Sequence, residues 1–388
     1  VSHTVTREWA ASAATHTLVE VTAEGQTTPV PCGVDVSGDR PVLFWELSGK
    51  TAAGAVRRFA WVPTTRAAAA SGDLLVTEKS GFIVVSNGFF CLKHPLRGGG
   101  GFPCDITYVH SGNADPQLFF FDRIVRRKGE NKGNAQYVAR DCTDAEARVV
   151  YQSPLRVVVE ARTGFGKKAA ETPGNPRVGY RYTYTAFSPV VEVSARYARE
   201  DDEPWHELHF LHLSRQERRY TRFVTGDTGK THSMQPKGAP SMAVTAPQWA
   251  VMSDGTNACG AGFDGAICWD ASKQFVYYIR SGHATWTERA YHFDGGLYFG
   301  PDKAAEWCAQ WLGRERSPDI RVLRDGKPWV SIDREVLKGA VELKNQALRL
   351  VFDSAEKGFD CLGIENRLVE DTRFVRMREG VAGLWSLT

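Results

Sequence analysis

A strict alternation of apolar and polar side chains, repeated in many short segments, limits this chain to a fold built from antiparallel sheets. In the segment 180–184 three tyrosines alternate with an arginine and a threonine. The segment 156–162 alternates between small apolar residues and a mostly charged set. A period of two places these residues on opposite sides of a strand, so that one face is buried and the other is polar. Such polar faces suit a binding surface as well as plain solvent.

Composition excludes several classes of protein. Of the 388 residues, 42% are hydrophobic and 24% are charged, so the chain is neither disordered, collagen-like nor a small disulfide scaffold. The 11 Trp, 12 Tyr, 20 Phe and 37 Gly, beside only 4 Met, favour strands and tight turns. A net charge of +3 argues against a nucleic-acid partner bound by counterion release. No apolar run approaches the roughly 18 residues of a membrane span, so no membrane partner is predicted.

Breaks in the pattern predict three parts. Residues 1–75 contain short strands separated by turns and are predicted to form a small β-sandwich, followed by an alanine-rich linker. Residues 80–315 hold a longer series of strands. Residues 335–388 are predicted to begin a further β module, which continues beyond Thr388 because so short a segment cannot enclose its own core.

Three segments of the longer series resemble a known family: YRYTYTAFSPVVEVSARY, WHELHFLHLS and HFDGGLYFGPDKAAEWCAQWLG. They resemble the galactose-mutarotase-like β-supersandwich of glycoside hydrolases and polysaccharide lyases, over residues 80–313. The resemblance implies a mostly β chain, in which an N-terminal β-sandwich precedes a large antiparallel β-supersandwich with few helices and a concave carbohydrate-facing surface. It implies no particular reaction, because such domains are catalytic in some enzymes and accessory in others.

The densest polar cluster lies in the segment 205–212. On a strand, Glu207 and His209 share one face, whereas His206 and His212 share the other face with Leu208 and Phe210. A glutamate and a histidine on one face can act as acid and base on a sugar, or form a plain hydrogen-bonded surface pair. The spacing of the histidines suits a metal only on a helix, so no metal site is predicted.

Two kinds of sugar cleavage remain open. A lyase needs a base and a cation that neutralises a uronate carboxylate; Arg162, Arg181 and Arg196 can supply the charge, or can form cross-strand pairs. The predicted catalytic set is Glu207, His209 and Arg196. A hydrolase instead needs two carboxylates. The candidate carboxylates are Asp105, Glu160, Glu192, Glu207 and Asp294.

Aromatic and basic residues near strand ends are the predicted substrate-binding set. The aromatic members are candidates for platforms under sugar rings, or core residues: Trp205, Tyr182, Trp249 and Trp286. The basic members are His94, Arg97 and Arg162. His94 and Arg97 precede the run Gly98–Gly101, which either lies close to a ligand or forms a flexible hairpin tip. Four further tryptophans are assigned to cores: Trp45 and Trp61 in the first sandwich, Trp307 and Trp311 on a helix predicted over 301–313.

Two cysteine pairs flank predicted turns, Cys91 with Cys104 and Cys259 with Cys268. Each pair either closes a disulfide, as a secreted protein permits, or remains as buried thiols.

The resulting prediction is the β-rich part of a secreted or periplasmic modular enzyme that binds and cleaves a polysaccharide or oligosaccharide, as a glycoside hydrolase or polysaccharide lyase. Its predicted partners are the carbohydrate and further domains beyond Thr388. No cofactor is predicted; calcium is left open, although nothing in the sequence indicates it. One alternative is a non-catalytic carbohydrate-binding or scaffold module of a larger glycosidase. A third reading is a structural β-sandwich without a sugar ligand.

Overall fold

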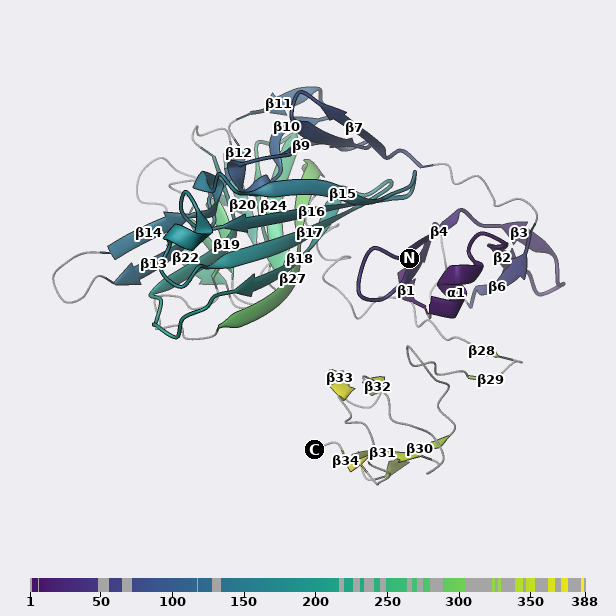
Figure 1. Cartoon of the computed structure of the whole chain (residues 1–388). Coiled ribbons are helices and arrows are strands. Elements are labelled where there is room, and N and C mark those ends of the chain that lie inside the picture. Colours follow the sequence, from purple (N-terminus) through teal and green to yellow (C-terminus); the bar gives the residue numbers. More distant parts are fainter. Residues whose placement is uncertain are drawn as a thin grey trace. The chain divides into compact units, whose positions relative to one another are not determined.

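The computed structural model describes part of the chain. The described residues are 2–5, 7–47, 56–64, 72–116, 118–127, 134–215, 220–225, 231–233, 241–244, 249–263, 267–270, 275–279 and 289–303, with short strands between 323 and 386. The predicted mostly-β fold is confirmed, because strands dominate these residues and α1 (Arg7–Ser12) is their single α-helix (Figure 1). The helix predicted over 301–313 lies beyond the described residues after 303. None of the described helices is long and apolar enough to cross a membrane.

The chain divides into two compact units, one formed by Val1–Ala69 with Pro318–Thr388 and one by Ala70–Ser317. The N-terminal part of the first unit has two three-stranded sheets. The strands of one sheet are, in order, β1 (Ser2–Thr4), β5 (Val42–Trp45) and β4 (Cys32–Asp35). The strands of the other are β3 (Thr27–Pro29), β2 (His16–Val21) and β6 (Arg58–Pro63). The strands of Pro318–Thr388 are β28 (Leu323–Arg324), β29 (Lys327–Pro328), β30 (Gly339–Lys344), β31 (Ala347–Phe352), β32 (Leu362–Asn366), β33 (Asp371–Val375) and β34 (Trp385–Ser386).

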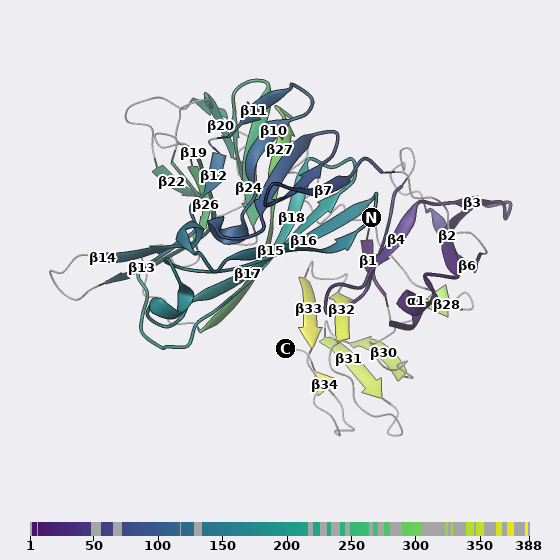
Figure 2. The same cartoon turned by 45° about the horizontal axis from the view of Figure 1, so that its top comes forward.

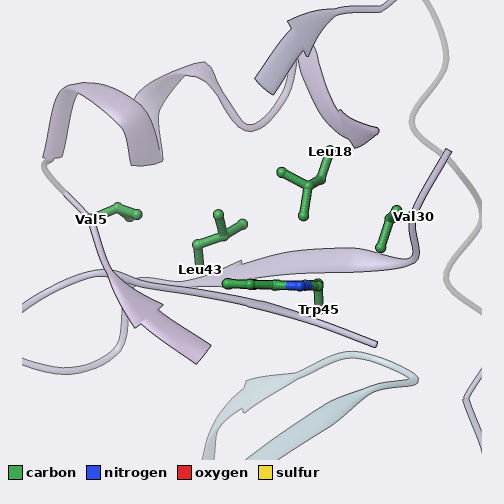
Figure 3. Close-up of a cluster of buried hydrophobic side chains, with 5 residues drawn as sticks. All are labelled: Val5, Leu18, Val30, Leu43 and Trp45. Atoms are coloured by element: carbon green, nitrogen blue, oxygen red, sulfur yellow. The ribbon is translucent and has the colours of Figure 1, made fainter. Parts of the chain in front are cut away.

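A compact apolar cluster joins the two sheets of residues 1–69. Its buried members are Val5, Leu18, Val30, Leu43 and Trp45. Figure 3 shows Leu18 and Leu43 approaching each other from strands of different sheets. Trp45 belongs to this cluster and Trp61 packs against it, so both contribute to the core of the first sandwich, as the sequence predicts.

Three antiparallel sheets form the second unit (Figures 1 and 2). We call them the large, second and N-terminal sheets. The nine strands of the large sheet are, in order, β15 (Glu146–Gln152), β16 (Arg156–Gly164), β17 (Arg177–Thr185), β18 (Val190–Ala198), β27 (Ala290–Pro301), β24 (Asn257–Phe263), β23 (Trp249–Ser253), β20 (Arg222–Thr225) and β21 (Thr231–Ser233).

The other two sheets are smaller. The second sheet runs β14 (Asn134–Val138), β13 (Arg123–Arg127), β19 (Glu207–Arg215), β26 (Phe275–Ile279), β25 (Ile267–Asp270) and β22 (Ser241–Val244), with β12 (Leu118–Phe120) also paired to β19. The N-terminal sheet runs β11 (Asn113–Asp115), β10 (Cys104–Tyr108), β9 (Phe90–Pro95), β8 (Phe82–Ser86) and β7 (Leu75–Lys79).

One face of the large sheet, its inner face, packs against both smaller sheets. Phe210 of the second sheet lies with its ring centroid 5.7 Å from Tyr197 and 4.9 Å from Phe293. Phe90 of the N-terminal sheet lies 5.9 Å from Tyr184. The tyrosine stripe of β17 therefore points into the core, and each ring contributes about 2 to 3 kcal/mol from the area it buries. The arginines that alternate with it lie on the opposite, outer face.

Neither predicted cysteine pair is joined. Cys91 and Cys104 lie on neighbouring strands, but they are not register partners, and both are free thiols. Cys259 belongs to the large sheet and Cys268 to the second sheet, so no hairpin connects their strands. Burial raises the pKa of Cys104 to about 12, which keeps its thiol protonated and unreactive.

Candidate functional site

An extra residue in β19 shapes the polar cluster of the second sheet. Phe210 lies opposite Tyr278 of β26, whereas Leu213 lies opposite Val276, so three steps along β19 match two steps along β26. Leu211, inside this bulge, has a positive φ of 47°. Bulges of this kind bend a strand and re-aim the side chains that follow.

The bulge moves His212 to the face that carries His209. Regular alternation predicts His212 beside Leu208 and Phe210, on the opposite side from His209. In the structure the ring centroids of His209 and His212 are only 5.7 Å apart. The prediction that His212 lies on the face of Leu208 and Phe210 is therefore wrong, because one extra residue breaks the alternation of β19. The sequence carries no glycine or proline that would mark the bulge.

Glu207 is the centre of this cluster. Its Oε2 lies 3.1 Å from Nε2 of His209 and 3.1 Å from Nη2 of Arg123 on the neighbouring strand β13. Nε2 of His206 lies 3.9 Å from Oε1 of the same carboxylate. We call Glu207, His209, His212 and Arg123 the β19 cluster. The sequence predicts the Glu207–His209 pair, but not Arg123, which lies 84 residues away from Glu207 and joins it only through the β13–β19 ladder.

The cluster lies at the boundary between core and solvent. The side chain of His209 is 3% exposed, those of Glu207 and Arg123 are 13% and 27% exposed. Arg123 is held in place by a second hydrogen bond, from Nη1 to Oε1 of Gln136, at 3.1 Å. A ligand can thus reach Glu207 and Arg123 from outside, while His209 lies behind them.

Asp122 holds the bulge from the inside. Its carboxylate accepts hydrogen bonds from the backbone N–H groups of Leu211 and His212, both at 2.8 Å, and from the hydroxyl of Tyr180. Burial raises the pKa of Asp122 to about 6, although these three donors oppose the shift. The same carboxylate thus satisfies two amides that the irregular strand leaves without a ladder partner.

The β19 cluster has the groups needed for proton transfer. A carboxylate and an imidazole joined by a hydrogen bond can exchange a proton, and either can serve as base or acid towards a substrate. The partly exposed Arg123 guanidinium adds a permanent positive charge to the cluster. This charge can stabilise a substrate carboxylate or a developing oxyanion. Among the described residues, no group of three or more His, Cys, Asp or Glu side chains is arranged to hold a metal ion.

Most of the predicted aromatic platforms are buried in the core. Tyr182 and Trp205 are fully buried, and Trp249 is 4% exposed. This burial corrects the sugar-platform prediction, because a ring without an exposed face cannot stack on a sugar. Trp205 packs against Tyr137 and lies beneath the guanidinium of Arg126. Trp286 lies outside the described residues.

The glycine loop and its neighbours are also structural. His94 is fully buried between the carbonyl of Gly101 and the hydroxyl of Tyr184. Gly101 has a positive φ of 66°, and a Cβ added there would lie 2.7 Å from that of Ala161. The loop is therefore packed rather than a flexible tip. Arg97 is exposed and its Nη1 lies 3.0 Å from Oε2 of Glu146.

Two arginines of the predicted site, one substrate-binding and one catalytic, lie away from Glu207. Arg162 and Arg196 are exposed on the outer face of the large sheet. Tyr197, next to Arg196, packs against Phe210, and Glu207 lies on the other side of β19 from Phe210. Arg196 and Glu207 thus occupy opposite sides of the sandwich. The structure separates Arg196 from the predicted catalytic pair and brings Arg123 to it instead.

The candidate carboxylates are similarly dispersed. Glu160, Glu192 and Asp294 share the outer face of the large sheet, on the side opposite Glu207. Asp105 lies on β10, where its Oδ2 is 3.2 Å from Nζ of Lys93. Of the five predicted carboxylates, Glu207 is the one that the described residues place beside histidines at a partly buried position.

Similarity to known proteins is seen in structure and not in sequence. No family model matches the chain, and no curated protein is similar to it in sequence. An α-mannosidase from Enterococcus faecalis V583 superimposes with a TM-score of 0.55 at 13% identity, over 89% of this chain and 46% of that one. A protein of glycosyl hydrolase family 38 from Enterococcus faecalis has a TM-score of 0.51 at 12% identity, over 95% and 50% of the two chains.

These similarities concern the fold. The chain spans about half the length of the two Enterococcus faecalis proteins. The fold is the galactose-mutarotase-like β-supersandwich that the sequence predicts.

Proposed function

We propose that the chain belongs to a carbohydrate-active enzyme that cleaves a polysaccharide or oligosaccharide at the β19 cluster. The observation that carries this proposal is the contact of one carboxylate, Glu207, with both an imidazole and a guanidinium at 3.1 Å. The fold shared with a protein named as an α-mannosidase supports a carbohydrate ligand. A non-catalytic carbohydrate-binding module is the competing reading.

The composition of the cluster favours elimination over hydrolysis. Elimination from a uronate needs a base for the proton beside the carboxylate and a cation that stabilises the negative charge developing there. Glu207 removes the proton at C5, His209 behind it can hold that proton, and Arg123 provides the cation. The C4–O bond breaks as the double bond between C4 and C5 forms, and the proton passes to the departing oxygen. Hydrolysis would need a second carboxylate on the other side of the glycosidic bond. We therefore propose a uronate-containing chain as substrate and an unsaturated sugar as product.

Incubation with polygalacturonate and with a neutral polysaccharide tests this proposal. Unsaturated products are followed by ultraviolet absorbance, and new reducing ends are followed separately. Glu207→Gln is expected to lower the rate at least a hundredfold, in line with the loss of acid–base catalysis. Glu20→Gln is the matched control, because Glu20 is also paired to an arginine, with Oε2 2.6 Å from Nη2 of Arg57, but belongs to the first unit.

Each outcome distinguishes between the readings. Reducing ends without ultraviolet absorbance would replace the lyase proposal with a hydrolase. Binding of a polysaccharide without either product would support the non-catalytic module. Equal rates for Glu207→Gln and the unchanged protein would remove the β19 cluster from the reaction.

A further inference from the structure

Four arginines surround one glycine on the outer face of the large sheet. Arg177 and Arg181 lie two residues before and after Gly179 on β17. Arg162 of β16 and Arg196 of β18 are the register partners of Gly179. Register partners and residues two apart share one face of a sheet, so the four side chains flank the glycine on all sides. We call these five residues the arginine notch (strands β16 to β18 in Figure 1).

The fold itself does not require glycine at position 179. Its φ lies outside the left-handed region, and a Cβ built there would have no atom within 4 Å. Glycine weakens the interior of a strand, and its presence there often marks a place where a ligand approaches the backbone closely. The open space above Gly179 is therefore better explained by a bound group than by packing.

The charges around this space favour an anion. Arg162, Arg177 and Arg196 are exposed, and the side chain of Arg181 is 23% exposed. Arg162 and Arg196 lie on the strands on either side of Gly179, so an anion placed over the glycine lies between two positive side chains. Guanidinium groups bind carboxylates through paired hydrogen bonds.

Neighbours already orient Arg177 and Arg181. Nη1 of Arg181 lies 3.0 Å from Oε1 of Glu160, and Nε of Arg177 donates to Oδ1 of Asn175 at 3.1 Å. Each guanidinium has further N–H groups for a ligand.

The adjoining row of side chains on the sheet has hydrogen-bonding groups that suit the hydroxyls of a sugar. The row that contains Arg181, about 6.7 Å along the strands from Gly179, also has Glu160, Ser194 and Asp294 on the outer face. Oγ of Ser194 lies 3.0 Å from Nε2 of His292, and that nitrogen lies 3.5 Å from Oδ1 of Asp294. Carboxylate, hydroxyl and imidazole groups can accept or donate hydrogen bonds to sugar hydroxyls.

We propose that the arginine notch binds the carboxylate of an acidic sugar unit of a polysaccharide, whose hydroxyls extend over the Glu160–Asp294 row. A densely charged chain such as a nucleic acid fits less well, since Glu146 and Glu160 also lie on this face, opposite Arg162 and Arg181. The notch lies on the opposite side of the sandwich from Glu207. The proposed ligand site therefore does not rest on the proposed reaction.

Calorimetric titration of the whole chain with oligogalacturonate, and with a neutral galactose oligomer of equal length, tests the proposal. Gly179→Val fills the space with a side chain that strands favour. Binding of oligogalacturonate is expected to weaken at least tenfold, with the melting temperature unchanged or higher. Arg162→Ala combined with Arg196→Ala is expected to weaken binding similarly. Arg222→Ala removes one charge from β20, four strands from β18 in the same sheet, and is expected to change the affinity less than twofold.

Glu207→Gln separates the two proposals, because it should stop product formation and leave binding at the notch intact. Unchanged affinity in Gly179→Val would overturn the notch as the site. Equal affinity for the neutral oligomer would overturn the carboxylate as the recognised group. Binding of a sulfated oligomer, or of single-stranded DNA, in preference to oligogalacturonate would likewise overturn the assignment.

Discussion

His94 is an imidazole whose two nitrogens have fixed roles. Nδ1 lies 2.8 Å from the carbonyl oxygen of Gly101, so it carries the proton and donates. Nε2 then accepts from the hydroxyl of Tyr184. Because the ring is fully buried, its pKa is lowered to about 4. At neutral pH the uncharged ring thus links the glycine loop to the large sheet.

Acidification is expected to weaken the fold through His94. Its pKa in the folded protein, about 4, is below the ordinary 6.5, so the unfolded chain binds the proton more readily. The contribution of His94 is fully present above pH 6.5 and is lost as the pH falls towards 4, by about 3 kcal/mol. Urea unfolding between pH 4 and 7 should show a flatter pH dependence for His94→Gln than for the unchanged protein.

A control is needed because Asp122 acts in the opposite direction. Its pKa is raised to about 6, so its contribution is present below about pH 4 and is lost as the pH rises through 6. Both proteins contain Asp122, so subtracting the unfolding free energy of His94→Gln from that of the unchanged protein at each pH cancels its contribution. Val36→Ala, at an exposed residue without an ionisable group, should leave the pH dependence unchanged. Parallel curves for all three proteins would contradict the assignment to His94.

At the scale of elements, the bulge in β19 decides which histidines meet. Asp122 bonds to both amides of the bulge, at Leu211 and His212. Asparagine in its place has one acceptor oxygen, so one of the amides faces an NH₂ group and is left unpaired. We expect Asp122→Asn to lower the free energy of unfolding by about 2 kcal/mol and to move His212 away from His209.

Nuclear magnetic resonance of the imidazole rings separates this positioning role from stability. In Asp122→Asn the contacts between the two rings should weaken and polysaccharide cleavage should fall, both beyond the loss of folded protein. Asp115→Asn is the matched control, because Asp115 is also fully buried and accepts from the Tyr220 hydroxyl, at 2.9 Å. If both variants changed the histidine signals equally, Asp122 would have no special role at the bulge.

The first unit offers a simpler test at the same scale. Leu43 lies in β5 and is 4% exposed, within the cluster that joins the two sheets. Leu43→Ala removes methyl groups and leaves a cavity, which should cost about 3 kcal/mol. Chemical unfolding followed by tryptophan fluorescence measures this loss. Val36→Ala, at a residue that is 61% exposed, should change stability by less than about 0.5 kcal/mol.

Strand alternation predicts which residues share a face, and it fails where the ladder is irregular. The pairing of Glu207 with His209 follows from a spacing of two, and the structure confirms it. His212 is misplaced by one extra residue, and Arg123 meets Glu207 only because β13 and β19 are neighbours in a sheet. Local periodicity predicts neither the bulge nor the strand order, since both depend on contacts between distant segments.

For the whole molecule, the predicted mostly-β supersandwich is confirmed, because alternation repeated over many strands depends little on any single register. The position of the functional groups was harder to predict. The predicted catalytic set combines Arg196 of the large sheet with Glu207, whereas two sheets packed through their inner faces put them on opposite sides. Tyr182 of the tyrosine stripe is predicted to be a platform for a sugar ring, yet it lies in the layer between those sheets.

This separation predicts that the two sites act independently within the second unit. Substitutions that share no contact usually add their free energies within about 0.5 kcal/mol. With a short oligogalacturonate that spans one site only, Arg162→Ala combined with Arg196→Ala should leave kcat/KM unchanged. With the polymer, the same variant should raise KM and leave kcat alone, because it removes a remote anchor and leaves Glu207 and His209 untouched. A fall in kcat on the short substrate would place the arginines in the reaction and contradict the two-sided arrangement.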